Sequence, residues 1–252
     1  MKLHCLGTTG FHPSPSRHTA CYYLPEIDLV LDAGTGLFRL VQCLLAEPKK
    51  SLTILLSHAH LDHIVGLTFL VDVMAVTELE HVTVIGESAK IAAVKEHLYH
   101  ELLFPVPPSM DFVELASSLG KMTLNKASLE WFPLEHPGKS IGFVLNIDGK
   151  KLAYVTDTVS RPEAEHMPTI ADADLLLHEC YFGDQHRKLA EKTGHSWLSA
   201  VTEIVEKTRA RKTALIHINP LAEILKTPIE LDDRHTKELQ MLVAKDEMVL
   251  EF

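Results

Sequence analysis

The string His-Ala-His-Leu-Asp-His at residues 58–63 constrains this chain more than any other feature, and it directly follows an apolar run. Imidazole and carboxylate groups are ligands that borderline and hard divalent ions accept. If a strand ends before the string, His58 and His60 point one way from extended backbone. If a helix begins within it, Asp62 and His63 present a second pair from the first turn. The string therefore predicts half of a site for two metal ions.

A simpler interpretation is that these polar residues cap a strand and start a helix, with Asp62 as the N-cap residue. A cap needs one Asp or Ser, however, and does not call for three neighbouring histidines. H-x-H-x-D-H after a hydrophobic strand resembles the signature of the metallo-β-lactamase superfamily. This resemblance implies an α/β protein with a four-layer αββα sandwich and a metal-dependent hydrolase site.

The composition bounds the remaining possibilities. The chain has 252 residues, of which 46% are hydrophobic and 23% charged, as is usual for globular proteins. No low-complexity stretch, repeat or Gly/Ser-rich linker divides it, so we expect a single domain over residues 1–252. The net charge of −10 disfavours broad attraction to nucleic acid. Two bound dications and a small basic patch would still leave RNA binding open.

The sequence carries no sign of export or of a membrane segment. Its N-terminus lacks the apolar region of a signal peptide. The longest apolar stretch, residues 64–76, contains Asp72 and is too short to span a bilayer. The four cysteines are scattered without a C-x-x-C pair, which is typical of reduced thiols in a core. We therefore expect a cytoplasmic protein that does not bind membranes.

Apolar runs and helical periodicity alternate along both halves of the chain. The predicted strands cover residues 2–6, 19–24, 28–32, 52–56, 82–86, 129–134, 141–147, 152–156, 175–178, 214–218 and 248–252. The predicted helices cover residues 37–46, 62–76, 88–103, 162–170, 185–192, 197–207 and 233–243. Such a mixture in both halves suggests two packed sheets with helices on their outer faces.

Three later polar residues each close an apolar strand, which is where metal sites tend to be built. They are His136, Asp157 and His217. Taken singly, either histidine is as well explained as a buried, hydrogen-bonded residue, and Asp157 as a turn residue. Together with the string at residues 58–63, they are better explained as metal ligands.

The resemblance assigns roles to these residues and implies two divalent ions. It places His58, His60 and His136 on one ion, Asp62, His63 and His217 on the other, and Asp157 between them. It also gives Asp32 the role of orienting a ligating histidine, for which ordinary turn capping is an equal alternative. Zinc is the expected metal, and manganese or iron remains open because the same ligands accept all three.

Two residues outside the ligand set point to phosphodiesters as substrates. Glu179 follows an apolar strand, and His195 precedes Ser196 in a Gly-His-Ser-Trp segment. This arrangement resembles the ribonuclease Z-like phosphodiesterase branch, which implies a catalytic set of His195, Glu179 and the ligand Asp62. His195 would protonate the leaving oxygen or stabilise charge on phosphorus, and Glu179 would orient its ring. A helix cap at Ser196 and a salt bridge of Glu179 are the alternatives.

The interval between His136 and Asp157 bears on substrate size. It spans 21 positions, which two strands and a turn at Asp148-Gly149 use up. Ribonuclease Z proper carries a long arm there that grips transfer RNA, so the short interval favours a small or cyclic phosphodiester. The alternatives are a tRNA 3′-processing endonuclease and a hydrolase of lactones, thioesters or β-lactams. The cysteine-rich zinc site of some small phosphodiesterases has no counterpart here.

Three further residues are candidates for contact with substrate. Arg17 and His18 lie in a proline-rich loop from which they could reach a substrate phosphate, and a solvated loop is the alternative. Ser196 is added because it adjoins His195. Members of the resembled branch are often dimers, so a homodimer is a further expectation.

Overall fold

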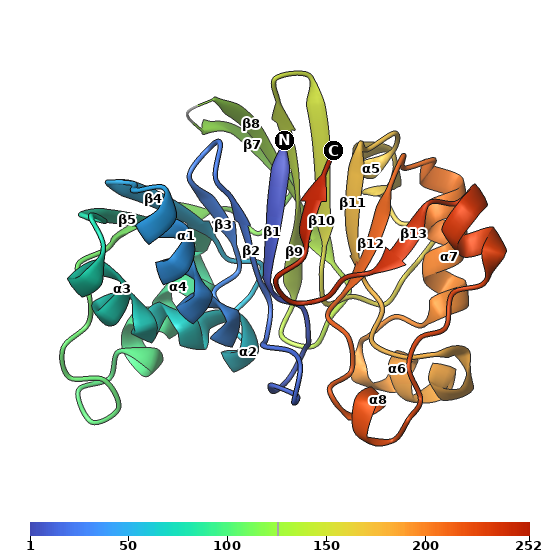
Figure 1. Ribbon diagram of the computed structural model, residues 1–252, viewed down its shortest axis with the longest axis horizontal. Coiled ribbons are helices and arrows are strands. Elements are labelled where there is room, and N and C mark those ends of the chain that lie inside the picture. The colour runs from blue at the N-terminus through green and yellow to red at the C-terminus, as the bar shows by residue number, and fades with distance from the viewer. Residues whose placement is uncertain (125) are drawn as a thin grey trace. The chain divides into compact units, whose positions relative to one another are not determined.

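The computed structural model describes residues 1–124 and 126–252 and divides into two compact units. The first unit comprises residues 1–117 and 245–251, and the second comprises residues 118–244 with Phe252. Each unit contains one seven-stranded mixed sheet and its own helices (Figure 1). The division leaves the single domain over residues 1–252 as a prediction.

The sheet of the first unit has the order β14-β1-β2-β3-β4-β5-β6. Strands β14, β1, β2 and β3 pair antiparallel, whereas β3 to β6 run parallel. Figure 1 shows the red C-terminal strand beside the blue β1. Its strands are β1 Lys2–Gly7, β2 Cys21–Leu24, β3 Leu29–Leu31, β4 Ser51–Leu55, β5 His81–Glu87, β6 Asp111–Leu115 and β14 Val249–Glu251.

The sheet of the second unit has the order β13-β12-β11-β10-β9-β8-β7. Strands β7 to β10 pair antiparallel, and β10 to β13 run parallel, so the carboxyl ends of β10, β11 and β12 share one edge. The strands are β7 Gly120–Leu124, β8 Ala127–Leu134, β9 Ser140–Ile147, β10 Lys150–Val155, β11 Leu175–Glu179, β12 Thr213–Ile216 and β13 Met241–Val243.

Short helices cover the sheets. The first unit has α1 Leu40–Ala46, α2 Leu61–Ile64, α3 Leu70–Val76 and α4 Ser88–Ala93, with 3₁₀ turns Thr35–Arg39 and Val65–Phe69 and a π turn Val94–Leu98. The second has α5 Met167–Ile170, α6 Arg187–Thr193, α7 Leu198–Thr208 and α8 Leu221–Ile224, with a 3₁₀ turn Asp184–His186 and a π turn Arg234–Glu238. In residues 1–124 and 126–252, no helix is both long enough and apolar enough to cross a membrane.

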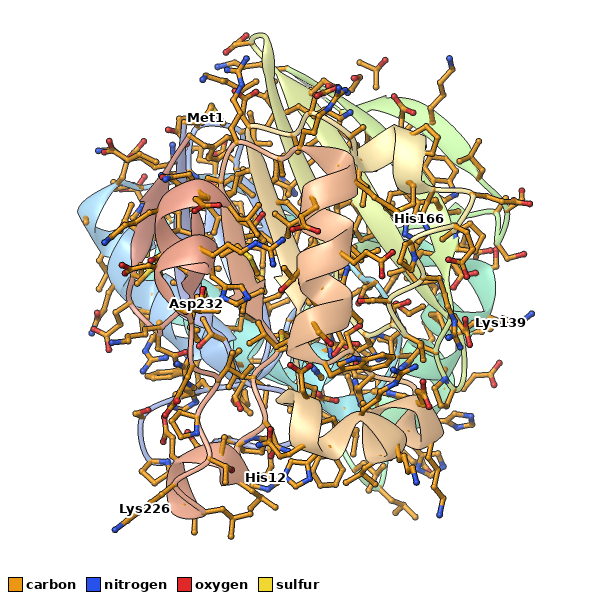
Figure 2. All side chains as sticks on the ribbon, turned by 90° about the vertical axis from the view of Figure 1, so that its right-hand side faces the viewer. Met1, His12, Lys139, His166, Lys226 and Asp232 are labelled. Carbon is orange, nitrogen blue, oxygen red and sulfur yellow. The ribbon has the colours of Figure 1, made fainter. Side chains whose placement is uncertain are left out.

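Each unit has its own hydrophobic core between its sheet and its helices. In the second unit, Val201, Ile204 and Val205 of α7 recur at helical spacing and pack with Leu176 and Leu215 of the sheet. Figure 2 shows α7 lying against one face of the strands. In the first unit, side chains of α1, α3 and α4 pack with β2 to β5 in the same way.

The structure corrects several predicted elements. The helix expected over residues 62–76 is three pieces, namely α2, the 3₁₀ turn Val65–Phe69 and α3, and Gly66 in that turn lies so close to the Gly34 carbonyl that no side chain would fit. The helix expected over 88–103 ends in a π turn at Leu98. The helix expected over 233–243 is a π turn followed by β13, whose pairing with β12 supplies its backbone hydrogen bonds. Strands β6 and β7 were not predicted, since both are edge strands with mostly exposed or half-buried residues.

Candidate metal centre

The predicted ligand string lies in the first unit, at the carboxyl edge of its parallel strands. His58 follows β4, and α2 begins at Leu61, so Asp62 and His63 sit in the first turn as predicted. One ring nitrogen of His58 and one of His60 lie within 4.8 Å of each other. Nε2 of His63 lies 3.4 Å from Oδ2 of Asp62. The string thus forms two adjacent ligand pairs on one short segment.

Asp32 holds this segment in place from the end of β3. Its carboxylate accepts hydrogen bonds from the backbone N–H of Ser57 (2.7 Å), the Ser57 hydroxyl (2.7 Å) and Nδ1 of His63 (2.8 Å). Because an ionised carboxylate only accepts, His63 carries its proton on Nδ1 and presents Nε2 as the ligand atom. Asp32 takes a left-handed backbone conformation (φ 54°), which turns the chain so that one carboxylate reaches both partners.

A loop over residues 8–18 also contacts the string. The backbone N–H of Phe11 donates to Oδ2 of Asp62 at 2.6 Å. Asp246 anchors the loop, since its carboxylate accepts bonds from the Thr8 hydroxyl and the His18 backbone N–H, each at 2.7 Å. Arg39 forms an ion pair with the same carboxylate. Sequence reasoning missed Asp246, which is more than 200 positions from the loop in sequence.

The structure places Arg17 and His18 on this loop. Arg17 is buried and donates through Nη1 to the Thr8 hydroxyl at 2.5 Å. Nδ1 of His18 lies 3.2 Å from the Thr35 hydroxyl. Both residues therefore help to hold the loop, and their contact with substrate stays a prediction.

The second unit gathers the later candidates at the carboxyl edge of its sheet. His136 follows β8, Asp157 follows β10, and His217 follows β12. Asp157 faces both histidines, with Oδ1 3.2 Å from Nε2 of His217 and Oδ2 3.6 Å from Nε2 of His136. Each carboxylate oxygen therefore faces a different imidazole, an arrangement that suits a carboxylate bridging two ions.

His136 is prepared for ligation by its surroundings. Its Nδ1 donates to the Gly194 carbonyl at 2.8 Å, which leaves Nε2 on the side of Asp157. Burial lowers the pKa of His136, with the Asp157 carboxylate opposing that shift. The neutral imidazole, which is the form that binds metals, is favoured.

Glu179 and His195 lie beside these ligands in the same unit. Nδ1 of His195 is 3.2 Å from Oε2 and 3.3 Å from Oε1 of Glu179. Glu179 is fully buried and also accepts from the backbone N–H of Thr158, so it is fixed at two points. Ligand atoms of Asp157, His195 and His217 lie within 4.8 Å of one another. Glu179 and His195, the predicted catalytic pair, therefore lie at the same sheet edge as the candidate ligands.

Tyr181 contributes a contact that sequence reasoning missed. Its ring stacks on His195 at 4.5 Å with 18° between the planes, and the His195 ring in turn lies 5.5 Å from that of His217. The aromatic residue two positions after Glu179 was the available signal, because strand-end residues share the edge that carries the site. Tyr181 and Glu179 together restrict the orientation of His195.

Ser196 has a buried hydroxyl with three partners. It donates to the Thr158 carbonyl at 2.6 Å and accepts from the backbone N–H of Ser160 (3.0 Å) and its hydroxyl (2.6 Å). These bonds tie the segment after Asp157 to the segment that carries His195. A contact of Ser196 with substrate stays a prediction.

The fold and the ligand sets define a class of α/β proteins whose imidazole and carboxylate groups cluster at the carboxyl edges of mixed sheets. Residues 28–218 match the family model of the beta-lactamase superfamily domain. The match covers well over half of the chain, which therefore belongs to the beta-lactamase superfamily.

Curated relatives and solved structures resemble the whole chain or parts of it. A ribonuclease Z of Exiguobacterium sp. is 26% identical over 270 residues, covering 87% of this chain and 89% of that protein. The chain spans 14% of a zinc phosphodiesterase ELAC protein 2 homolog of Caenorhabditis elegans, which is 28% identical over 125 residues. It also spans 33% and 22% of two further ribonucleases Z, from Halorubrum lacusprofundi and Acaryochloris marina.

Solved structures establish the fold. The structure of human tRNase Z, short form, superposes with a TM-score of 0.76 at 19% identity, covering 100% of this chain and 99% of that one. A diphosphatase of the PhnP family gives a TM-score of 0.70 at 19% identity, with coverages of 100% and 97%. At such identities the likeness shows the fold alone, and it confirms the predicted αββα metallo-β-lactamase fold.

Proposed function

We propose that this protein is a dinuclear metal-dependent hydrolase that cleaves small or cyclic phosphodiesters. The observation that carries the proposal is the Glu179–His195 pair at 3.2 Å, placed with Asp157 and His217 at one strand edge. A hydrolase that uses only metal-activated water has no need of a buried carboxylate that orients a separate imidazole. Phosphodiester cleavage does, because a poor leaving oxygen must receive a proton.

The donor sets fit two divalent ions. His58, His60 and His136 would hold one ion, Asp62, His63 and His217 would hold the second, and Asp157 would be a ligand of both. These are nitrogen and oxygen donors of the kind that zinc, manganese and iron accept, and zinc is the expected ion. When bound, the ions lower the pKa of a coordinated water to about 7 and neutralise charge on the phosphate. Membership of the superfamily supports this joint assignment.

The protein groups then handle the proton and the leaving group. Attack by a water oxygen forms one P–O bond while another breaks, and the departing oxygen takes a proton from His195. Glu179 accepts a hydrogen bond from Nδ1–H of His195, so the charge of Glu179 stabilises the imidazolium form of His195 that donates this proton. Tyr181 stacks on the ring and keeps it from rotating. Asp62 is the proposed acceptor for a proton of the attacking water.

The structure of the interval between His136 and Asp157 supports a small substrate. Strands β9 and β10 pair as a hairpin with a turn at Asp148 and Gly149 and use up nearly the whole interval. The alignment with the Exiguobacterium relative runs over 270 residues although this chain has only 252, so that relative carries segments without a counterpart here. We therefore propose a substrate that does not need a long RNA-binding arm in this interval.

Two rival functions remain as outcomes of the test. The curated relatives named ribonuclease Z favour an endonuclease that processes the 3′ end of tRNA. The same metal site would also serve a hydrolase of lactones, thioesters or β-lactams. Both rivals use the same ions, so metal dependence alone does not separate them.

The deciding experiment compares substrates with the metal-loaded protein. We expect hydrolysis of bis-p-nitrophenyl phosphate and of 2′,3′-cyclic nucleotides, with little cleavage of precursor tRNA or of lactones. Far faster cleavage of precursor tRNA would establish the endonuclease instead. Hydrolysis of esters or lactones at a rate that His195→Ala leaves unchanged would establish the lactone, thioester or β-lactam hydrolase.

A further inference from the structure

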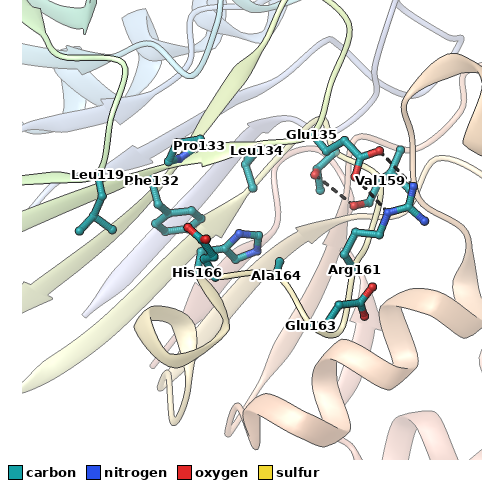
Figure 3. Close-up of a pocket in the computed structure, with 12 residues that line it drawn as sticks. Leu119, Phe132, Pro133, Leu134, Glu135, Val159, Arg161, Glu163, Ala164 and His166 are labelled. Atoms are coloured by element: carbon teal, nitrogen blue, oxygen red, sulfur yellow. Dashed lines mark hydrogen bonds and ion pairs between the residues drawn. The ribbon is translucent and has the colours of Figure 1, made fainter.

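A pocket of about 590 Å³ opens in the second unit. Figure 3 shows the residues that line it. Glu135 and Thr158 line it, and they are the chain neighbours of His136 and Asp157. The backbone N–H of Val159 donates to the Glu135 carbonyl at 3.0 Å and joins the two ligand-bearing segments along the pocket wall. The volume is in the range of sites for small organic ligands.

One wall of the pocket is an imidazole held flat. The ring of His166 stacks on that of Phe132 (Figure 3). The ring centroids are 4.7 Å apart, with 18° between the planes. Phe132 is buried and stacks on one face of the imidazole, and both residues line the pocket. Within residues 1–124 and 126–252, no group hydrogen-bonds to the His166 ring nitrogens.

The protonation state of His166 is set by its surroundings. Burial, and to a smaller extent His178, lowers the pKa of His166 to about 4. At pH 7 the ring is therefore neutral and presents one N–H donor and one lone pair. A neutral imidazole that lines the pocket and is held by stacking on Phe132 is a suitable surface for a flat heteroaromatic group.

The charged groups around the pocket are mainly acidic. Arg161 donates to Glu135 through Nε and Nη2, each at 3.0 Å, so the only cation among the described lining residues is already paired. Glu163 and Glu165 are exposed at the pocket and form no salt bridge with a described residue. The excess of carboxylates disfavours phosphate in the pocket and favours a group with N–H donors.

We propose that this pocket binds a nucleobase of the substrate and selects bases with an exocyclic amino group. The ring stacks on His166, and Glu163 or Glu165 accepts hydrogen bonds from the amino group, as carboxylates do from cytosine. The proposal rests on the proposed function, because the diester phosphate of the same substrate would lie at the adjoining metal ligands. It narrows the substrate class to diesters of amino-substituted nucleosides.

Binding is tested with the metal-loaded, full-length protein and two nucleosides, cytidine and uridine, which differ in an amino against a carbonyl group. Neither carries a phosphate, so binding does not depend on hydrolysis. We expect calorimetry to show cytidine binding roughly 5- to 150-fold more tightly than uridine, the range for one well-placed base contact. The double variant Glu163→Gln/Glu165→Gln should reduce this preference to near unity, and the exposed α7 variant Glu203→Gln should retain it.

Turnover supplies the second readout. The ratio of kcat/KM for 2′,3′-cyclic CMP to that for 2′,3′-cyclic UMP should fall in the double variant and in His166→Ala. Equal binding of the two nucleosides, or a preference that the double variant leaves unchanged, would overturn the pocket assignment. Selective binding of cytidine without hydrolysis of any diester would support the pocket and overturn the proposed function. Hydrolysis that does not distinguish the two cyclic nucleotides would overturn the pocket and support the function.

Discussion

Oδ2 of Asp32 and Nδ1 of His63 are hydrogen bonded at 2.8 Å, and neither side chain is exposed to solvent. The bond fixes which nitrogen of His63 carries the proton and which way its ring faces. Because Asp32 also holds Ser57, one carboxylate sets the positions of both ends of the ligand string. This relationship leads directly to a prediction about metal affinity.

Asp32→Asn should weaken zinc binding by about 10- to 100-fold, because the amide cannot accept every bond that the carboxylate accepts. Competition against a chromogenic chelator measures this affinity. Asp72→Asn, on the exposed side of α3, is the matched control and should bind zinc like the wild type. Unchanged zinc affinity in the Asp32 variant would show that the bond is only a structural cap.

His195→Ala should lower kcat for a linear diester by roughly 10²- to 10⁴-fold while the metal content stays the same. The reason is that His195 donates a proton but is not in the proposed ligand set. Steady-state kinetics and elemental analysis of the same samples measure the two quantities. The exposed His186→Ala in the same unit is the control.

The metal content separates two roles for His195. Its ligand atom lies within 4.8 Å of those of Asp157 and His217, which is close enough for a shared ion. A loss of one ion per chain in His195→Ala would identify His195 as a ligand and contradict its role as the proton donor.

Gly66→Ala should destabilise the protein by about 1–3 kcal/mol or more, because an added Cβ would lie 2.2 Å from the Gly34 carbonyl oxygen. Urea unfolding measures the change. Gly183→Ala is the control, since its Cβ would meet only the flexible end of Gln185 at 2.5 Å. Equal stability of the two variants would mean that the 3₁₀ turn shifts without cost to accept the methyl group.

The stability of the protein should depend on pH through His166. Its pKa is lowered to about 4 in the folded state against 6.5 in the unfolded chain, so between these values the unfolded state binds more protons. The stabilisation is complete above pH 6.5 and is lost as the pH falls towards 4. Lowering the pH from 7 to 5 should therefore reduce the free energy of unfolding through His166 by roughly 1–2 kcal/mol. The variant His166→Phe keeps a ring against Phe132 and should not show this loss.

Urea unfolding of the two proteins at both pH values measures this difference. The two proteins differ only at position 166, so the comparison isolates the effect of replacing His166. A gap between the two proteins that is the same at pH 7 and pH 5 would contradict the lowered pKa.

Much of the candidate site could be predicted because its residues carry local signals. His58 to His63 stand in one string, and His136, Asp157, Glu179 and His217 each end a recognisable apolar strand. A strand end is a local event, and in parallel strands the carboxyl ends meet at the same edge. The pattern of apolar runs therefore predicted which residues would gather at an edge of a sheet.

Other contacts depend on residues far apart in the chain and left no local signal. Asp246 anchors the loop that begins at Thr8, and Tyr181 stacks on His195, through meetings that only folding produces. The edge strands β6, β7 and β13 were missed because their hydrogen bonds, rather than a buried apolar pattern, hold them in the sheets.

The fold class and the identity of the candidate ligands could be inferred from the amino-acid sequence, since apolar periodicity and the chemistry of His, Asp and Glu are properties of short segments. Folding was needed to show which nitrogen of His63 and of His136 is left for a metal ion, that Arg17 is buried where it holds a loop, and that an acidic pocket opens beside His166. Those features arise from hydrogen bonds and packing between distant segments, whose geometry no local pattern specifies.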